Sequence, residues 1–240
     1  MVHMSLAGLF PIDKWNFKTQ SILNELPEGE LAELNAHMQE IRFGKGEVIF
    51  REGAVATGIY FLKKGKVKKY QVGQTGREHI IYIANAGEFI GYHAILAEER
   101  YPDSAAALEE CLAGFIAKEE FLRILQQSTT LPRRLLKVLS HEFTVLSNSI
   151  SVFAQRSVKE RLAIALIVLR EKFKIGTTQP DEIIINLSRS DLAGMVGTGS
   201  ENIVRILAEF KSAGIITSQG RKICIKDIRR LITISQSGNL

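Results

Sequence analysis

The most constraining feature of the sequence is Gly197, which separates two segments with helical signals. Ser188 and Asp191 have the spacing of a capping box before the first segment, and Thr198 and Glu201 have the same spacing before the second. Two helices joined by a glycine turn of three or four residues are typical of a helix-turn-helix. The region around Gly197 therefore predicts that structure, with the second helix ending near residue 212.

The residues inside this region fit the same prediction. Ala193 falls where two such helices approach too closely for a large side chain, and Gly197 falls where the turn requires a positive φ. The positions expected to face inwards are all apolar: Leu192, Val196, Ile203, Leu207 and Phe210. Residues 215–227 are predicted to form two strands joined at Gln219 and Gly220, which makes a wing next to the two helices.

The exposed face of the second helix is the candidate surface for reading a nucleic acid. Glu201 and Arg205 lie four residues apart and hence on one helical face. An intrahelical salt bridge is one interpretation, but here we favour base recognition, with Arg205 bonded to guanine O6 and N7 and Glu201 accepting from cytosine N4. The predicted DNA-binding residues are Ser188, Arg189, Thr198, Ser200, Glu201, Asn202, Arg205, Arg221 and Lys222.

The charge distribution supports a polyanionic partner for this region. The chain has a net charge of +5, and residues 159–240 carry the whole excess, with 13 Lys and Arg against 8 Asp and Glu. A basic C-terminal third predicts double-stranded DNA as the partner. A winged helix that binds a protein instead is the alternative.

Other signals bound the class of protein. No apolar run approaches the ~20 residues that span a bilayer, and the N-terminus does not resemble a signal peptide, so we expect a cytoplasmic protein with no membrane partner. We find no nucleophile motif, phosphate-binding loop, paired catalytic carboxylates or metal-ligand spacing, so we expect no enzyme, no catalytic residue, no metal and no cofactor. Cys111 and Cys224 lie in apolar surroundings and are expected to be buried thiols.

Residues 41–117 have a different pattern, in which short β-type runs are separated by glycines. Such spacing predicts an antiparallel barrel or jelly roll. The expected strands are residues 48–50, 59–62, 67–70, 80–83, 89–90 and 111–116, and short helices are expected at 27–40 and 118–127.

A long helix is predicted after Pro132, a residue that a first helical turn tolerates. Its apolar residues recur at alternating spacings of three and four, which is a heptad seam: Leu136, Leu139, Phe143, Leu146, Ile150 and Phe153. So narrow a stripe favours pairing with the same helix of a second copy, and packing within the chain is the alternative. A hinge at 154–158, a capping box at Ser157 and Glu160, a helix to 173, a loop at 175–182 and a strand at 183–187 should follow.

Residues 187–216 (LSRSDLAGMVGTGSENIVRILAEFKSAGII) resemble the DNA-binding signature of the Crp–Fnr family of bacterial regulators. The resemblance implies an α+β chain with a β-roll sensor at 1–130, a dimerisation helix and hinge at 131–157, and a winged helix-turn-helix at 158–240. It implies a homodimer on an inverted-repeat operator, RNA polymerase as a further partner, and base contacts from Glu201 and Arg205. The cyclic-AMP receptor protein has an arginine where this chain has Ser200, so one base contact fewer is expected.

The sensor end departs from the family pattern. Cyclic-nucleotide pockets of the family carry a glutamate after a glycine, and an Arg-Ser or Arg-Thr pair about ten residues later that holds the cyclic phosphate. This chain keeps Gly91 but has Tyr92 for the glutamate, and Asp103 and Ser104 where the pair belongs. Because Asp103 would repel a phosphate, we expect that cyclic AMP is not the effector; Arg100, close by in sequence, is the alternative phosphate ligand.

Several effectors therefore stay open at this stage. The chain has no cysteine before Cys111, which excludes the N-terminal cysteine set of the redox-sensing relatives, and His79 and His93 are candidate haem ligands that we interpret as ordinary polar residues. An uncharged or amphipathic ligand and no effector at all remain alternatives. The predicted effector pocket consists of Tyr82, Gly91, Tyr92, His93, Arg100, Tyr101 and Ser104.

Overall fold

The computed structural model describes residues 6, 8–17, 22–23, 26–174 and 183–236. The chain divides into two compact units. One consists of Phe17–Gly76 and Ile80–Phe143, and the other of Met1–Asn16, Arg77–His79 and Thr144–Leu240. The proposed domain boundaries at 130 and 157 stay a prediction, because the units are defined by contacts and divide within a helix.

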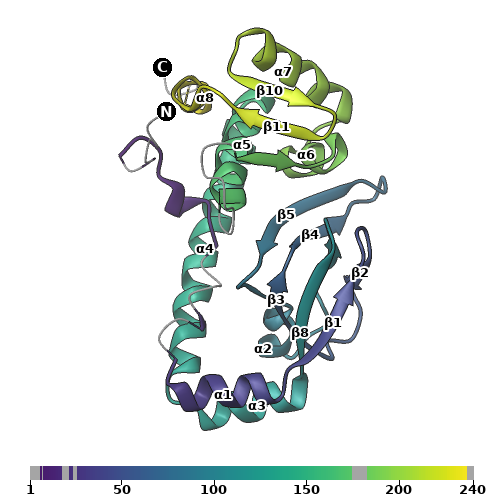
Figure 1. The fold of residues 1–240 in the computed structure, drawn as a ribbon, viewed down its shortest axis with the longest axis vertical. Helices are drawn as coiled ribbons and strands as arrows, with labels where there is room; N and C mark the ends of the chain where they lie inside the picture. The colour runs from purple at the N-terminus through teal and green to yellow at the C-terminus, as the bar shows by residue number, and fades with distance from the viewer. Residues whose placement is uncertain (1–5, 7, 18–21, 24–25, 175–182, 237–240) are drawn as a thin grey trace. The chain divides into compact units, whose positions relative to one another are not determined.

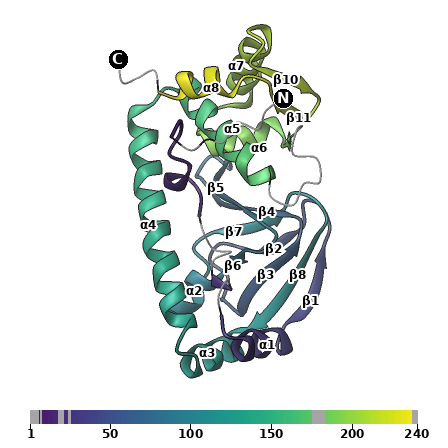
Figure 2. The ribbon, with the colours of Figure 1, turned by 60° about the vertical axis from the view of Figure 1, so that its left-hand side comes forward.

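The first unit is a β-roll of two four-stranded antiparallel sheets (Figure 2). The sheet orders are β1-β8-β3-β6 and β2-β7-β4-β5. The strands are β1 (Gln39–Phe43), β2 (Val48–Phe50), β3 (Gly58–Lys64), β4 (Lys66–Val72), β5 (Glu78–Asn85), β6 (Phe89–Ile90), β7 (Ser104–Ala107) and β8 (Cys111–Ala117). Alternating side chains form the core, with Leu62, Val67 and Ile116 fully buried. The predicted β-roll is confirmed.

Three short helices accompany the sheets. Helices α1 (Glu28–Ala36) and α3 (Lys118–Gln127) lie side by side (Figure 1), and Arg123 joins them by donating to Glu33 over 2.8 Å. The predicted helix at 118–127 is confirmed, but the one at 27–40 ends earlier because its last residues belong to β1. Neither β7, a run of alanines after one serine, nor α2 (Tyr92–Ala97), a helix of under two turns, was predicted.

Helix α4 (Leu131–Gln155) is the predicted long helix. The Oγ of Ser128 accepts hydrogen bonds from the backbone N–H of Leu131 (2.8 Å) and Thr130 (3.2 Å), which satisfies two free donors at the start of the helix. The helix carries two apolar stripes instead of the single one expected. The second stripe is buried and contains Leu131, Leu135, Val138 and Val145, and the buried Glu142 lies among them.

The second unit contains a winged helix. Besides the end of the long helix, the unit consists of η1 (Ile12–Lys14), α5 (Val158–Lys174), β9 (Ile184–Asn186), α6 (Arg189–Val196), α7 (Ser200–Ser212), β10 (Ile216–Gln219), β11 (Lys222–Ile225) and α8 (Ile228–Ser235). Strands β10, β11 and β9 form an antiparallel sheet in that order, which confirms the predicted wing (Figure 1). Helix α8 was not predicted, and the predicted loop at 175–182 lies outside the described residues.

The hinge prediction agrees with the helix ends. Helix α4 ends at Gln155 and α5 begins at Val158. The predicted capping box is present, because the Glu160 carboxylate accepts from the Ser157 backbone N–H over 2.8 Å and the Ser157 Oγ accepts from the Glu160 N–H over 3.3 Å. No helix among the described residues is long and apolar enough to cross a membrane.

Candidate nucleic-acid interface and sensor pocket

The turn between α6 and α7 has the geometry that the sequence predicted. Ser188 caps α6, with its Oγ accepting from the Asp191 N–H over 2.9 Å. Gly197 ends α6 at φ +69°, a left-handed conformation that favours glycine. Ala193 is buried, and Ile203 is fully buried where α7 packs on α6. These contacts fix the angle at which α7 presents its outer face.

The capping box predicted at Thr198 and Glu201 is wrong. Gly199 is the N-cap of α7 and offers no side-chain cap, so the helix begins at Ser200. Glu201 is then the second helical residue, and a capping box needs the acid at the third. Thr198 instead accepts a hydrogen bond through Oγ1 from Asn202 Nδ2 over 3.1 Å.

The outward face of α7 is exposed and polar at its N-terminal end. Glu201, Asn202, Val204 and Arg205 are exposed, and Ser200 is half-buried. Arg205, with 65% of its side chain exposed, forms an ion pair with Glu209 over 2.7 Å and not with Glu201. Glu209 also accepts from Lys159 Nζ over 2.9 Å, and the two cations lower the pKa of its carboxyl. Arg205 is therefore held along the helix, while Glu201 makes no recorded ion pair within the described chain.

Two of the predicted DNA-binding arginines have partners within the winged helix. Arg189, at the start of α6, donates through Nη2 to the Gly220 carbonyl at the wing tip over 2.8 Å, and burial lowers its guanidinium pKa. Arg221 lies 3.7 Å from the Asp191 carboxylate. Lys222 is exposed on β11. Arg189 and Arg221 thus attach the wing to α6, and whether they also contact DNA stays a prediction.

Arg161, which the sequence analysis did not single out, joins the hinge to the helix-turn-helix. Its Nε donates to the Val196 carbonyl and its Nη1 to the Arg156 carbonyl, each over 2.9 Å. Its guanidinium also lies 5.2 Å from the centre of the Phe153 ring. A Cβ atom at Gly197 would lie 2.9 Å from that ring, so Phe153 packs against the turn as well as belonging to the predicted seam. No local sequence signal marks these contacts, because their partners are 5 to 35 residues away.

The predicted dimer seam is exposed along α4. Leu136, Phe143 and Ile150 are 67%, 73% and 71% exposed, and Leu146 and Phe153 are also exposed. Leu139 is half-buried. The adjacent stripe of the helix is the buried one, so the chain's own packing leaves these large apolar side chains in water.

In the β-roll, the tyrosine that replaces the family's glutamate is bonded to the long helix. The Tyr92 hydroxyl donates to Glu142 Oε1 and His93 Nε2 contacts Glu142 Oε2, each over 2.6 Å. The Tyr92 and His93 rings stack with their centres 4.1 Å apart. Burial and the Glu142 carboxylate raise the pKa of Tyr92 far above its usual value, so it stays a neutral donor. His93 therefore has a carboxylate partner on α4.

Other members of the predicted pocket also bond to the protein. The Tyr101 hydroxyl donates to the Gly58 carbonyl over 2.8 Å, and its ring stacks on Phe50 at 4.1 Å. The Ser104 Oγ accepts from the Glu52 N–H over 2.9 Å, and Arg100 donates to the Gly53 carbonyl over 2.9 Å.

Gly91 and Tyr82 occupy two further positions of the predicted pocket. Gly91 caps α2 at φ +85°. Tyr82 packs its ring on Phe17 at 4.3 Å. The structure thus uses most of the polar groups that the sequence analysis assigned to an effector.

Asp103, expected to repel a phosphate, is neutralised from within the roll. Its carboxylate lies 3.0 Å from Lys69 Nζ, and both side chains are largely buried. Lys69 lies on β4, and Asp103 comes just before β7. These two strands are paired, with Tyr70 of β4 opposite Ser104 of β7. A buried charge needs such a partner, since leaving either one unpaired is expensive. Lys69 is the cation that the sequence analysis missed.

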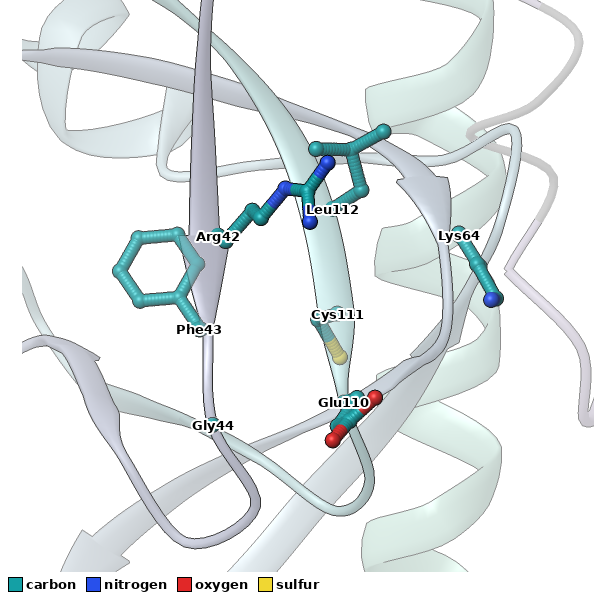
Figure 3. A pocket seen from close by; sticks show the side chains of 7 residues that line it. All are labelled: Arg42, Phe43, Gly44, Lys64, Glu110, Cys111 and Leu112. Atoms are coloured by element: carbon teal, nitrogen blue, oxygen red, sulfur yellow. The ribbon is translucent and has the colours of Figure 1, made fainter.

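The two cysteines differ. Cys111 lies on β8 opposite Phe43 of β1, at a hollow of ≈450 Å³ on the sheet that Arg42, Lys64 and Leu112 also line (Figure 3). Its thiol is buried and donates to the Lys66 and Glu109 carbonyls over 3.3 Å, and burial raises its pKa, which is the inert state expected. Cys224 is only half-buried, so the prediction was wrong for that thiol. Among the described residues, no group of three His, Cys, Asp or Glu side chains could hold a metal ion.

Comparison with known proteins identifies both parts. Residues 40–128 match the cyclic nucleotide-binding domain family, and residues 160–234 match the Crp-like helix-turn-helix domain. The anaerobic regulatory protein of Haemophilus influenzae is 26% identical over 211 residues, which cover 88% of this chain and 82% of that protein.

Solved structures share the fold. FixK2 from Bradyrhizobium japonicum aligns with a TM-score of 0.73 at 20% identity, covering 82% of this chain and 96% of that one. The c-di-GMP responsive global regulator CLP of Xanthomonas campestris aligns at 0.70 and 22%, covering 83% and 99%. With a cyclic-nucleotide-binding-like β-roll and a Crp-like winged helix-turn-helix, this chain belongs to the Crp–Fnr family of transcription regulators.

Proposed function

We propose that the protein binds an inverted-repeat operator as a homodimer and regulates transcription from there, with RNA polymerase as its partner. The observation that carries the proposal is the exposed polar face of α7, on which Glu201, Asn202 and Arg205 project near the start of the helix. In a helix-turn-helix, this end of the second helix contacts base edges in the major groove.

The second helix of each subunit would reach one half-site, so the two α4 helices must hold them at a fixed separation. The exposed residues Leu136, Phe143, Leu146 and Ile150 supply an apolar seam for this pairing. Half-sites centred about one helical turn apart are expected for such a dimer.

The test is operator binding by an Arg205→Ala variant. Loss of the guanidinium should cost about 1–3 kcal/mol per half-site and relax selectivity at one G·C pair. Glu209→Gln is the matched control, because it removes the ion-pair partner of Arg205 and keeps the guanidinium. It should leave selectivity unchanged. A footprint that is equally strong and equally selective in Arg205→Ala would contradict base recognition by this residue.

Salt dependence separates DNA binding from the protein-binding alternative. Contacts to phosphates release counterions, so the logarithm of the operator affinity should fall linearly and steeply as the logarithm of the salt concentration rises.

We further propose that cyclic AMP does not control this DNA binding. The side chains at the positions for the ribose and the phosphate are Tyr92, bonded to Glu142, and Asp103, paired with Lys69. Neither offers what the nucleotide needs, and a phosphate beside Asp103 would compete with that carboxylate for Lys69. The remaining possibilities are an uncharged or amphipathic ligand, a cyclic nucleotide in a rearranged pocket, and constitutive DNA binding.

Titration calorimetry with cyclic AMP should show no saturable binding at cellular concentrations. Tight binding that is lost in Arg100→Ala would contradict this proposal and would make Arg100 the phosphate ligand in a rearranged pocket.

A further inference from the structure

A cavity of ≈590 Å³ lies within the second unit, apart from the β-roll. It is partly open to solvent and is lined by residues of the segment around η1, the C-terminal half of α4, α5 and α8. Ligand cavities for small molecules usually measure about 300–1,000 Å³ and combine apolar walls with a few polar groups. This cavity has that size and, as its lining shows, that composition.

The walls of the cavity are apolar on one part and cationic on another. Phe10, Trp15, Val152 and Ile164 supply aromatic and aliphatic surface, with Phe10 and Trp15 stacked at 6.1 Å. Lys14 and Arg156 supply positive charge, and no Asp or Glu belongs to the lining. An anionic group on a bound molecule would therefore be attracted to this side of the cavity, most strongly by the cation that has no carboxylate partner of its own.

The two cations differ in what they already bind. Arg156 forms an ion pair with Glu160 over 3.2 Å, so part of its charge is compensated. Lys14 has an exposed side chain and makes no recorded ion pair in the part of the chain that the structure describes. Lys14 is therefore the cation available to a ligand, while Asn148 Nδ2 holds its backbone by donating to the Lys14 carbonyl over 3.2 Å.

Trp15 adds an unused hydrogen-bond donor. Its indole Nε1 is buried and has no acceptor within the described residues. A buried donor without a partner costs about 1–3 kcal/mol, and such groups usually find a protein acceptor or water. A small movement of the ring towards an oxygen of a bound molecule would satisfy it.

The position of the cavity connects it with the hinge. Asn148, Val152 and Arg156 follow one another at four-residue spacing, on a face of the helix different from that of Leu146 and Ile150. Pairing through the exposed seam therefore leaves the cavity open. Arg156 lies between α4 and α5 and Ile164 lies on α5, so a molecule in the cavity would touch both sides of the hinge.

We propose that this cavity is a binding site for a small amphipathic monoanion, a carboxylate or sulfonate carried on an aromatic or branched apolar body. The apolar body lies against Trp15, Val152 and Ile164, and the anionic group faces Lys14. The proposal goes beyond operator binding and does not depend on it.

Two dyes with the same ring system test the site directly. The first is 8-anilino-1-naphthalenesulfonate, an amphipathic monoanion, and the second is N-phenyl-1-naphthylamine, its uncharged analogue. Trp15 is the only tryptophan of the chain, so energy transfer from its emission to a dye reports occupancy beside Trp15. We expect saturable 1:1 binding with quenching of Trp15, and tighter binding of the anionic dye.

Variants of the lining separate this site from other apolar surfaces. Val152→Phe fills the cavity and should weaken both dyes by about tenfold or more, whereas Val55→Phe, at an exposed valine of the β-roll, should change neither. Lys14→Ala should weaken only the anionic dye, by about three- to fivefold, and Lys45→Ala, on an exposed turn, should have no effect. Because Lys14 is exposed, its variant tests the site even if Val152→Phe unfolds the protein. Binding without Trp15 quenching, or equal affinities for both dyes in Lys14→Ala and the parent protein, overturns the proposal.

Discussion

The winged helix and the β-roll use their polar side chains in opposite ways. On α7, Glu201 and Asn202 remain exposed, and Arg205 keeps most of its side chain in water although it is ion-paired. In the β-roll, Tyr92, Tyr101, Ser104 and Asp103 are buried and bonded to other residues of the chain. The α7 surface is left available for a partner. In the β-roll, the polar groups at the family's ligand position bond to the protein itself.

This difference supports the two proposals made above, that α7 recognises DNA and that cyclic AMP does not bind the β-roll. A recognition helix contributes through exposed groups that can bind DNA. On α7, Glu201 and Asn202 are exposed, and Arg205 would exchange its exposed ion pair with Glu209 for a base. A sensor pocket needs groups that gain more from the ligand than they lose from the protein. Tyr92 and Asp103 each have a charged partner, so a ligand at the family's cyclic-nucleotide position would have to break those contacts. A ligand beside Lys14 in the ≈590 Å³ cavity would not.

The largest expected effect tests whether the exposed apolar seam of α4 joins two copies of the chain, so that two α7 helices bind DNA together. Replacing Leu146 and Ile150 with Glu should abolish the dimer and weaken operator binding by about 100-fold or more, because a single half-site cannot supply the affinity of two linked ones. Sedimentation velocity and gel-shift titration measure both. Ser147→Glu, an exposed residue beside the seam, is the matched control and should leave the dimer intact. An intact dimer in the double variant would show that the interface lies elsewhere and that the exposed seam of α4 does not join the two copies.

The winged helix was predictable because its signals are local. The capping box of α6 lies within four residues, and the left-handed Gly197 and the buried Ile203 follow at fixed spacings in one short segment. The error at Thr198 shows the limit of such reasoning. A shift of one residue in the helix start removes the capping box, and spacing alone does not determine whether Thr198 or Gly199 is the cap.

The β-roll site was less predictable because its partners are distant in sequence. Glu142 is 50 residues from Tyr92, and Ser104 is 52 residues from Glu52. Lys69 meets Asp103 only because β4 pairs with β7, a strand that the sequence analysis missed. The sequence alone shows that Tyr92 and Asp103 depart from the family motif. Their partners, Glu142 and Lys69, could be identified only from the fold.

A second variant tests whether the β-roll groups stabilise the protein. Glu142→Ala should lower the free energy of unfolding by about 2–3 kcal/mol, because it leaves the buried Tyr92 hydroxyl without its acceptor. Tyr92→Phe removes one donor from the same carboxylate and should cost about 1–2 kcal/mol. Urea denaturation followed by circular dichroism measures these changes, with Glu119→Ala, an exposed acid of α3, as a control that should stay within about 0.5 kcal/mol. If Glu142→Ala is as stable as that control, the cluster is free for a ligand and the contrast with α7 disappears.

The smallest expected effect concerns the two helix starts of the winged helix. The sequences at Ser188 and Thr198 both have the spacing of a capping box, but only Ser188 caps its helix. Ser188→Ala removes an oxygen that accepts from the Asp191 N–H at the start of α6, and it should cost about 1 kcal/mol of unfolding free energy. Thr198→Ala removes a hydroxyl that caps nothing, since Gly199 is the N-cap of α7 and the hydroxyl bonds only the exposed Asn202 side chain, so it should cost about 0.3 kcal/mol or less. Both residues belong to the predicted DNA-binding set, so the measurement is thermal unfolding without DNA, where base or phosphate contacts play no part. Equal losses in the two variants would mean that α7 begins with Thr198 as its cap. Glu201 would then bond back to the Thr198 N–H and would be drawn away from the cytosine that we expect it to contact.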